Sequence, residues 1–180
     1  MGLLDGKVAI VTGAGGGLGR THAIALAKEG AKVVINDLGG AVDGSGGDNA
    51  MADQVANEIK EMGYEAAASY TSVADREGAE AIFQTALDAF GRVDIVVNNA
   101  GILRDRTLLK MTDDEFDLVM TVHARGTYLC TKIAGAYFKE AGHGGSIINT
   151  TSYSGLVGNF GQSNYGCAKA GIAEIGRAHV

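Results

Sequence analysis

The chain has 180 residues, of which 46% are hydrophobic and 20% are charged, and this composition excludes an intrinsically disordered protein. Its 28 glycines follow no three-residue period, which excludes collagen. The net charge of −6 comes without any cluster of Lys or Arg, so we expect no nucleic-acid partner. No apolar run reaches the ~18 residues that a membrane span needs, and the first residues lack the pattern of a signal peptide. We therefore expect a soluble, cytoplasmic protein without a membrane partner.

The first part of the chain is predicted to form a strand, a glycine turn, a helix and a second strand. An apolar, β-rich run predicts a strand over Lys7–Thr12, and a glycine cluster follows it. The amphipathic stretch Thr21–Glu29 predicts a helix that Gly30 closes. The second strand is expected over Ala31–Asn36. Both strands are apolar throughout, which is typical of a parallel sheet that is covered on both faces.

Strands and helices continue to alternate after a glycine-rich loop, Leu38–Asn49. A capping box at Thr112 and Glu115 opens the longest predicted helix. The alternation predicts an α/β fold with a doubly wound parallel sheet of the Rossmann type, in one dinucleotide-binding domain over residues 1–180. In such a sheet the ligand crevice lies at the carboxyl ends of the strands. The further predicted helices are Ala50–Met62, Asp75–Phe90, Thr112–Glu140 and Asn164–His179, and the further strands are Glu65–Val73, Arg92–Asn98 and Ser146–Thr150.

The glycine cluster between the first strand and the first helix has the features of a phosphate-binding turn. Gly13 and Gly17 permit a tight turn and the close approach of a diphosphate, which backbone N–H groups at the helix start would face. Gly19 lets the helix pack near the sheet. The spacing is G-x-x-x-G-x-G, so Leu18 occupies the place of the third glycine of the G-x-G-x-x-G pattern. We assign these four residues to cofactor binding, and the alternative is a turn without a ligand.

Asp37, which ends the second predicted strand, is the candidate for selecting the nucleotide. A carboxylate at this place accepts hydrogen bonds from ribose hydroxyls and repels a 2′-phosphate. Gly16 lies where a basic side chain would have met that phosphate. Both features favour NAD over NADP as the cofactor, and the alternative for Asp37 is a solvated turn residue.

Tyr165 and Lys169 are four residues apart on a predicted helix, so they share one face. An alcohol gives up hydride readily only if its hydroxyl proton leaves as well, and a phenolate would accept that proton. A nearby ammonium favours the phenolate form. Ser152, at the end of the fifth predicted strand, would hydrogen-bond the same substrate oxygen. The Tyr-x-x-x-Lys spacing is common by itself, but together with the serine and the glycine turn it indicates a dehydrogenase.

These motifs resemble those of the short-chain dehydrogenases/reductases: the glycine turn Thr12–Gly19, Asn98-Asn99-Ala100-Gly101, Ser152, and the Tyr165–Lys169 pair, in the order of that family. The resemblance implies an NAD(P)-dependent oxidoreductase with Ser152, Tyr165 and Lys169 as catalytic residues. It also implies that Tyr165 and Lys169 contact the nicotinamide ribose. For the adenosine side it implies Asn99, Ala100, Gly101, Ser72 and Val73, and a local turn is the alternative for the last two.

A narrower resemblance points to the substrate. The segments Asn36–Gly40, Ala86–Arg106 and Gly158–Tyr165 resemble the (3R)-3-hydroxyacyl-CoA dehydrogenase domains of peroxisomal multifunctional β-oxidation enzymes. This implies a secondary alcohol or ketone in an acyl thioester as the small-molecule substrate, with a hydroxysteroid as the alternative. The reaction would run in the reductive direction if the chain acts as the 3-oxoacyl reductases do, since these share its motifs. The peroxisomal location is not carried over.

His123 stands where most members of the family have an asparagine that supports a water relay to the lysine, and the multifunctional enzymes resemble this chain in having histidine. Because imidazole both donates and accepts hydrogen bonds, we include His123 among the catalytic candidates. The alternative is a hydrogen-bonded structural histidine. The sequence has neither a Cys/His cluster nor a pair of acidic ligands with metal-binding spacing, so we expect no metal.

The chain stops one helix after Lys169, whereas a complete fold of this kind uses at least a sixth strand. We therefore expect a sheet truncated after the helix that follows strand five, without the C-terminal strands and substrate lid of the family. Either the chain is a fragment or its fifth strand has become a sheet edge. Relatives assemble through the helices that correspond to Thr112–Glu140 and Asn164–His179, so we expect a homo-oligomer.

Two other functions compete with the dehydrogenase. A relative that holds NAD without catalysis, or an inactive fragment of such an enzyme, would have the same glycine turn. An S-adenosylmethionine methyltransferase also has a glycine turn and an acidic residue after the second strand. Such a methyltransferase has no use for Ser152, Tyr165 and Lys169 in this arrangement.

Overall fold

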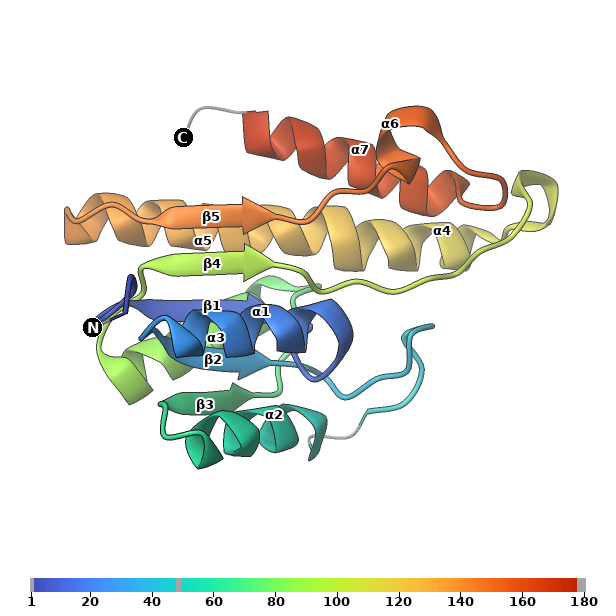
Figure 1. Cartoon of the computed structure of the whole chain (residues 1–180). Coiled ribbons are helices and arrows are strands. Elements are labelled where there is room, and N and C mark those ends of the chain that lie inside the picture. The colour runs from blue at the N-terminus through green and yellow to red at the C-terminus, as the bar shows by residue number, and fades with distance from the viewer. Residues whose placement is uncertain (1, 48–49, 178–180) are drawn as a thin grey trace.

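A computed structural model of the chain describes residues 2–47 and 50–177, and it contains a five-stranded sheet (Figure 1). The strand order is β3-β2-β1-β4-β5, and every neighbouring pair is parallel. The chain adds strands on one side of β1 and then on the other, so the order reverses between β1 and β4. This confirms the doubly wound Rossmann-type sheet and places the crevice at that reversal. The strands are β1 (Val8–Thr12), β2 (Lys32–Asn36), β3 (Ala66–Ser69), β4 (Ile95–Asn98) and β5 (Ser146–Asn149).

Helices cover both faces of the sheet, with α1 and α2 in front of it and α3 and α5 behind it in Figure 1. The helices are α1 (Gly17–Lys28), α2 (Ala50–Glu61), α3 (Arg76–Phe90), α4 (Asp113–Met120), α5 (Gly126–Ala141), α6 (Ser154–Val157) and α7 (Ser163–Arg177). A 3₁₀ turn, η1 (Leu108–Lys110), precedes α4, and a π-helical segment, η2 (Thr121–Arg125), joins α4 to α5.

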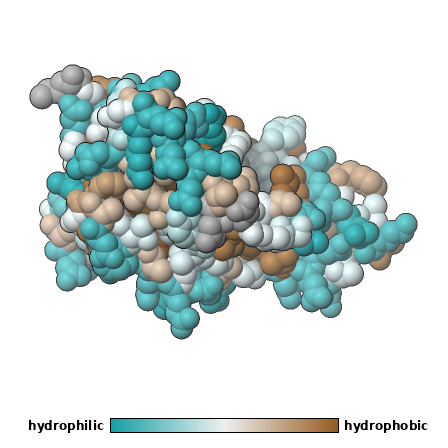
Figure 2. Space-filling model, turned by 90° about the horizontal axis from the view of Figure 1, so that it is seen from below, coloured by the Kyte–Doolittle hydropathy of each residue, from teal (hydrophilic) through white to brown (hydrophobic). Residues whose placement is uncertain are grey.

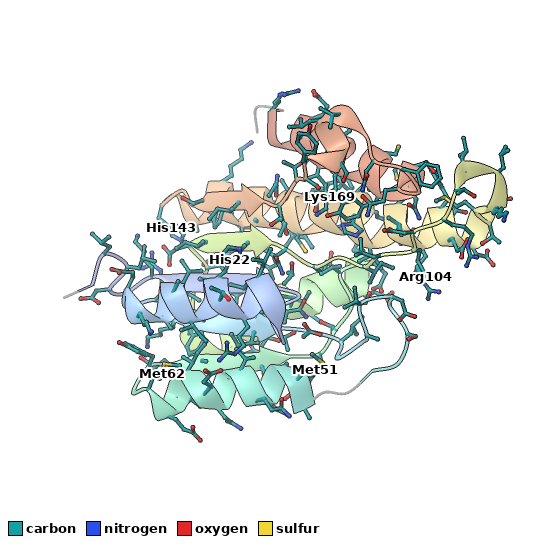
Figure 3. The ribbon with its side chains drawn as sticks, turned by 45° about the vertical axis from the view of Figure 1, so that its right-hand side comes forward. His22, Met51, Met62, Arg104, His143 and Lys169 are labelled. Atoms are coloured by element: carbon teal, nitrogen blue, oxygen red, sulfur yellow. The ribbon has the colours of Figure 1, made fainter. Side chains whose placement is uncertain are left out.

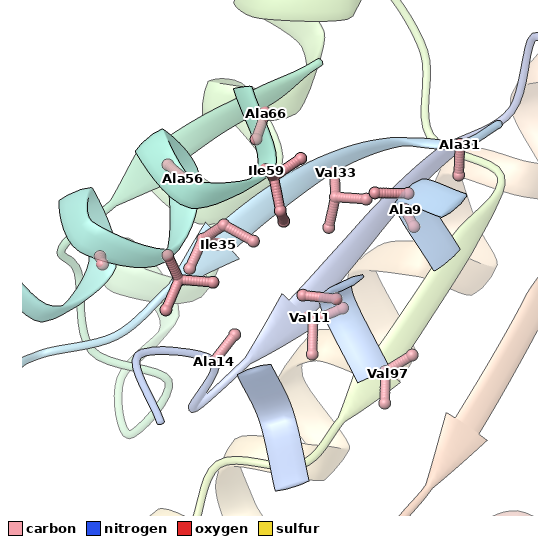
Figure 4. Packing of buried hydrophobic residues seen from close by; sticks show 14 of the residues in the cluster. Ala9, Val11, Ala14, Ala31, Val33, Ile35, Ala56, Ile59, Ala66 and Val97 are labelled. Carbon is pink, nitrogen blue, oxygen red and sulfur yellow. The ribbon is translucent and has the colours of Figure 1, made fainter. Parts of the chain in front are cut away.

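The two cores follow from the alternation of side chains along each strand. Ala9 and Val11 of β1 point to the side of α1 and α2, where they join a buried cluster with Ile35 and Ile59 (Figure 4). Val8 and Ile10 point to the other side, into a cluster with residues of α3 and α5. The middle strands β1, β2 and β4 are buried on both faces and largely apolar, which holds their carboxyl ends in place. Viewed from below, the surface combines hydrophilic areas with smaller hydrophobic ones (Figure 2).

The predicted helix Thr112–Glu140 is present as one run of helical backbone over residues 113–141, but it is not α-helical throughout. The capping box at Thr112 and Glu115 is present, and α4 begins there as expected. One turn of π-helix then separates α4 from α5. Hydrophobic periodicity does not readily reveal such a turn, because the period stays helical on both sides of the inserted residue and only its phase changes.

Other predicted boundaries also shift. The third strand was expected over Glu65–Val73, but β3 ends at Ser69, because its pairing partner β2 ends at Asn36, opposite Ser69. The first helix begins at Gly17 instead of Thr21, and the short helix α6 was not predicted. The predicted ends of the glycine-rich loop, at Asn49, and of the last helix, at His179, lie outside the described residues.

β5 forms one edge of the described sheet, an arrangement that both alternatives for the end of the chain share. Its Ile148 side chain is 50% exposed, whereas the strands in the middle of the sheet are buried. In the described part of the chain, no helix has the length and apolar character needed to cross a membrane.

Candidate active site

Hydrogen bonds fasten the glycine turn to the end of β4. The hydroxyl of Thr12 donates to the carbonyl of Val97 at 3.3 Å and accepts from the backbone N–H groups of Asn99 and Ala100, both at 3.1 Å. The side-chain amide of Asn99 donates to the carbonyls of Thr12 and Gly13 at 3.0 Å each. Gly13 has a φ of +64°, and a Cβ there would lie 2.7 Å from the Cα of Ala100. Only glycine fits this close approach of two backbones.

The start of α1 is shaped to receive an anion. Gly16 is the N-cap, no side chain of the described residues caps the first turn, and that turn contains no acidic residue. Gly17 has a φ of +50° and nothing within 4 Å of the place of a Cβ, so space is open there. A Cβ at Gly19 would lie 2.1 Å from the carbonyl oxygen of Gly13, so this glycine allows α1 to approach the turn. Leu18 is 67% exposed and does not line the adjoining cavity. The first N–H groups of α1 therefore face open space with the favourable end of the helix dipole.

Asp37 connects the glycine turn to the loop after β2. Its Oδ2 accepts from the N–H of Gly15 and its Oδ1 from the N–H of Gly39, both at 2.7 Å. A Cβ at Gly15 would lie 2.8 Å from the carboxyl carbon of Asp37. A carboxylate has about four acceptor sites, so Asp37 retains capacity for ribose hydroxyls. The carboxylate therefore has a structural task in addition to the predicted one.

A cavity of about 560 Å³ extends from this turn across the carboxyl ends of the strands, a size typical of small-molecule sites. Most of the predicted cofactor residues line it: Gly13, Gly17, Asp37, Ser72, Val73, Asn99, Ala100 and Gly101. The loop after β2 contributes one wall, through residues such as Val42 and Gly44. Leu18, Gly19, Ser152, Tyr165 and Lys169 are outside this lining.

Lys169 of α7, labelled in Figure 3, is buried and lies beside the ring of Tyr165. Only 4% of Lys169 is exposed, and its Nζ donates to the carbonyl of Thr150 at 2.6 Å and lies 5.6 Å from the centre of the Tyr165 ring. Burial lowers the pKa of Lys169 to about 8, so the amine is still mostly protonated near neutrality. Ser152 follows two residues after Thr150, and its Oγ accepts from the N–H of Ser154 at 3.2 Å, so its hydroxyl proton is available to another acceptor. The structure thus brings Tyr165 and Lys169 together next to the end of β5.

His123 lies in the π-helical segment, edge-on to Tyr165 with 5.3 Å between the ring centres. Its Nε2 is 2.9 Å from the backbone nitrogen of Ile102 and 2.8 Å from the carbonyl oxygen of Ile102. Nδ1 is buried and has no partner among the described residues. Burial, and secondarily the cation of Lys169, lower the pKa of His123 to about 4, so the ring is neutral at neutral pH. A neutral imidazole packed against Gly101, where a Cβ would lie 2.3 Å from Cε1, favours the structural alternative.

We expect this histidine to make the fold sensitive to acid. The pKa of His123 in the folded chain, about 4, is below its ordinary value of 6.5, so unfolding takes up a proton between these values. Stability should therefore decrease as the pH falls from about 6.5 to 4, by on the order of 3 kcal/mol from this group. The variant His123→Asn should lose most of this dependence in urea unfolding followed by circular dichroism. An equally steep pH dependence in both proteins would contradict the burial of a neutral ring.

Sequence reasoning did not single out Asn164, which precedes Tyr165 and is fully buried. Its Nδ2 donates to the carbonyls of Arg104 at 3.0 Å and Glu115 at 3.1 Å, and its Oδ1 accepts from the N–H of Tyr165 at 2.7 Å. One side chain thus joins α7, α4 and the segment after β4. An asparagine near a helix start is a known capping signal, but that signal does not indicate the contacts with α4 and with the segment after β4.

Comparisons with known proteins agree with this architecture. The family model described as short chain dehydrogenase matches residues 7–179. The chain belongs to the short-chain dehydrogenase family. The family uses nicotinamide cofactors.

Two relatives and one solved structure illustrate the membership. The chain is 54% identical over 98% of its length to peroxisomal multifunctional enzyme type 2 of Drosophila melanogaster, and 44% identical over 96% to a hydroxyacyl-CoA dehydrogenase of Mycobacterium tuberculosis. A crystal structure of a short chain dehydrogenase from Mycobacterium avium superposes with a TM-score of 0.88 at 48% identity and covers 97% of the chain. The chain spans 28%, 55% and 62% of the lengths of these three proteins, respectively.

Proposed function

We propose that the chain is an NAD-dependent oxidoreductase that interconverts the secondary alcohol and the ketone of a 3-hydroxyacyl or 3-oxoacyl thioester. The observation that carries this proposal is the buried cation of Lys169, 5.6 Å from the centre of the Tyr165 ring, beside a cavity built on a glycine turn. A buried cation without a carboxylate partner costs stability, which favours a functional reason for its presence. The hydroxyacyl-CoA dehydrogenase relative supports the thioester.

The cavity and the turn fit a nicotinamide dinucleotide. The uncapped start of α1 and the open space at Gly17 would hold the diphosphate. Asp37 would hold the adenosine ribose, with Ser72 and Val73 toward the adenine, since all three line the cavity. Tyr165 and Lys169 would hold the nicotinamide ribose. Asn99, Ala100 and Gly101 would support the adenosine side of the cofactor, since they line the same cavity.

The residues of the chain would move one proton while the substrate changes its oxidation state. When bound, the nicotinamide ring supplies the carbon that takes the hydride from the alcohol or returns it to the ketone. Tyr165 takes the hydroxyl proton of the alcohol, so that the hydride leaves carbon as the C–O double bond forms. The Nζ of Lys169, 5.6 Å from the centre of the Tyr165 ring, would place a positive charge beside this proton transfer. Ser152 donates a hydrogen bond to the substrate oxygen and holds it toward Tyr165. In the reductive direction Tyr165 returns the proton to the carbonyl oxygen.

His123 would act by holding the side chain of Tyr165 in place, and Gly101 leaves room for the His123 ring. The Nε2 of His123 is bound to the backbone of Ile102, and its ring lies nearly perpendicular to the ring of Tyr165 with 5.3 Å between their centres. We propose a positioning role for His123, because the lowered pKa makes proton transfer from the imidazole unfavourable near neutrality.

Replacing Asp37 should change the choice of cofactor. The variants Asp37→Ala and Asp37→Asn both remove the charge that repels a 2′-phosphate, so the ratio of kcat/KM for NADH over NADPH should fall by about tenfold or more. Asp37→Asn keeps one acceptor for the N–H of Gly15 or Gly39, so it should retain more stability. Steady-state kinetics with both cofactors measure the ratio, and an unchanged ratio in both variants would remove Asp37 from the ribose site.

The function is tested by following NADH oxidation with acetoacetyl-CoA, in parallel with NADPH and with a 17-ketosteroid. Turnover with acetoacetyl-CoA and NADH that exceeds the other combinations would support the proposal. Faster turnover of the ketosteroid would assign the hydroxysteroid as the substrate. Tight binding of NADH without turnover of any substrate would favour the non-catalytic relative or the inactive fragment.

A further inference from the structure

Arg104 is a cation beside the cavity to which the proposed mechanism gives no task. It follows β4 by six residues and is partly buried. In Figure 3 it lies below Lys169, where the chain leaves β4 at the side of the strand carboxyl ends. Its Nε is shielded from solvent and has no hydrogen-bond partner among the described residues. A buried donor without an acceptor is unfavourable, so a partner for this guanidinium is expected.

Among the described residues, no carboxylate forms an ion pair with Arg104. Arg106, two residues further on, pairs with Glu115, with 2.8 Å between Nη2 and Oε1. The carboxylate of Asp43 is turned to Ser45, whose N–H and hydroxyl donate to its Oδ1 at 2.9 and 2.6 Å. These hydrogen bonds are the main reason that the pKa of Asp43 is lowered, and Arg104 adds a smaller electrostatic contribution. The effect of Arg104 on Asp43 is therefore smaller than that of the hydrogen bonds from Ser45.

Backbone contacts place Arg104 between the cavity and the catalytic helix. Ile102 lines the cavity, and the N–H of Leu103 donates to the carbonyl of Val42 at 2.9 Å, which holds the loop after β2 beside this segment. On the other side, the carbonyl of Arg104 accepts from the side chain of Asn164, which precedes Tyr165. A substrate whose carbonyl reaches Tyr165 would leave the site past this segment. The cofactor diphosphate, in contrast, belongs to the start of α1.

We propose that Arg104 binds a phosphate group of the pantetheine thioester that carries the substrate. The proposal rests on the function proposed above. A guanidinium presents a planar set of N–H donors that match two phosphate oxygens, and it keeps its charge at any physiological pH. The phosphate has two possible sources, coenzyme A or the phosphopantetheine of a carrier protein. Both carry it at the end of the pantetheine arm, away from the acyl carbonyl.

The test compares three ligands that share the pantetheine arm: coenzyme A, 4′-phosphopantetheine and pantetheine, which lacks a phosphate. Their dissociation constants are measured by calorimetry on the full chain saturated with NADH, so that the nucleotide of coenzyme A does not enter the cofactor site. Arg104→Ala should weaken binding of the phosphorylated ligands by about five- to twentyfold and leave pantetheine unchanged. Arg104→Lys keeps the positive charge, so it should weaken the binding of the phosphorylated ligands less than Arg104→Ala does. Lys28→Ala removes an exposed cation at the other end of α1 and should change nothing.

Each outcome decides the proposal. A loss for both coenzyme A and phosphopantetheine supports the proposal, because these two ligands share the phosphate at the end of the pantetheine arm. A loss for coenzyme A alone would overturn it, because Arg104 would then bind a phosphate of the nucleotide. Equal losses for all three ligands, weaker binding of NADH, or no preference of the wild-type chain for phosphate would overturn it. Because binding is measured, the same result is expected with Tyr165→Phe. A failure of the catalytic function is therefore distinguishable from a failure of this site.

Discussion

Replacing Tyr165 with phenylalanine should lower kcat by about a thousandfold or more, because the substrate proton then has no acceptor in the site. Cofactor affinity should change little, since the glycine turn and Asp37 hold the other parts of the dinucleotide. The measurements are the absorbance of NADH during turnover and the fluorescence of NADH during binding. If turnover and NADH binding were both lost, Tyr165 would be needed for the structure of the site.

The chain provides a matched control for this substitution. Tyr128 and Lys132 have the same four-residue spacing on α5, and the Nζ of Lys132 donates to the hydroxyl of Tyr128 at 3.1 Å. That hydrogen bond is the main reason that the pKa of Tyr128 is lowered, yet both side chains are exposed. Tyr128→Phe removes the same hydroxyl away from the cavity, so kcat should be unchanged. A comparable loss in both variants would contradict the assignment of Tyr165.

Replacing Lys169 with methionine should abolish turnover and at the same time stabilise the fold. Burial lowers the pKa of Lys169 from 10.5 to about 8, so the folded state holds its cation at a cost. Methionine removes this cost but also loses the hydrogen bond that Lys169 donates to the carbonyl of Thr150. At pH 7 the balance should raise the free energy of unfolding by on the order of 1–3 kcal/mol. The cost is complete below pH 8 and disappears as the pH rises toward 10.5, where the amine is neutral in both states.

Urea unfolding at several pH values measures this effect. The difference between the wild type and Lys169→Met should be largest near pH 7 and shrink above pH 8. Lys132→Met removes a solvent-exposed ammonium, and its stability should stay within about 0.5 kcal/mol of the wild type. A destabilised Lys169→Met protein at pH 7 would show that the lysine stabilises the fold, and the functional explanation for its burial would then be lost.

The sheet and the glycine turn could be predicted because local signals and the global fold agree. Continuous apolar strands such as Val8–Thr12 fit only a sheet covered on both faces, and Gly13 is required by the backbone of Ala100. The Tyr-x-x-x-Lys spacing alone was not decisive, since Tyr128 and Lys132 share it. Burial separates the two pairs, and burial depends on the packing of α7 against distant segments.

Features that depend on contacts between distant segments could not be predicted. The three hydrogen bonds of Asn164 join α7 to α4 and to the segment after β4, and the neutral state of His123 depends on its burial. The hydrogen bonds that Asp37 accepts from the N–H groups of Gly15 and Gly39 also could not be predicted from the sequence. The preference for NAD, the homo-oligomer and the cytoplasmic location stay predictions.

The π-helical segment between α4 and α5 has a consequence for mutational scans of residues 113–141. One extra residue in a helical turn rotates everything that follows by about 100° around the axis. Residues seven apart on either side of Thr121–Arg125 therefore do not lie on the same face of the helix. A single helical wheel drawn through α4 and α5 would assign buried and exposed positions incorrectly in one of the two helices. Deleting one residue from this segment would make the helix regular, but it would turn His123 or the buried residues of α5 away from the residues that they contact.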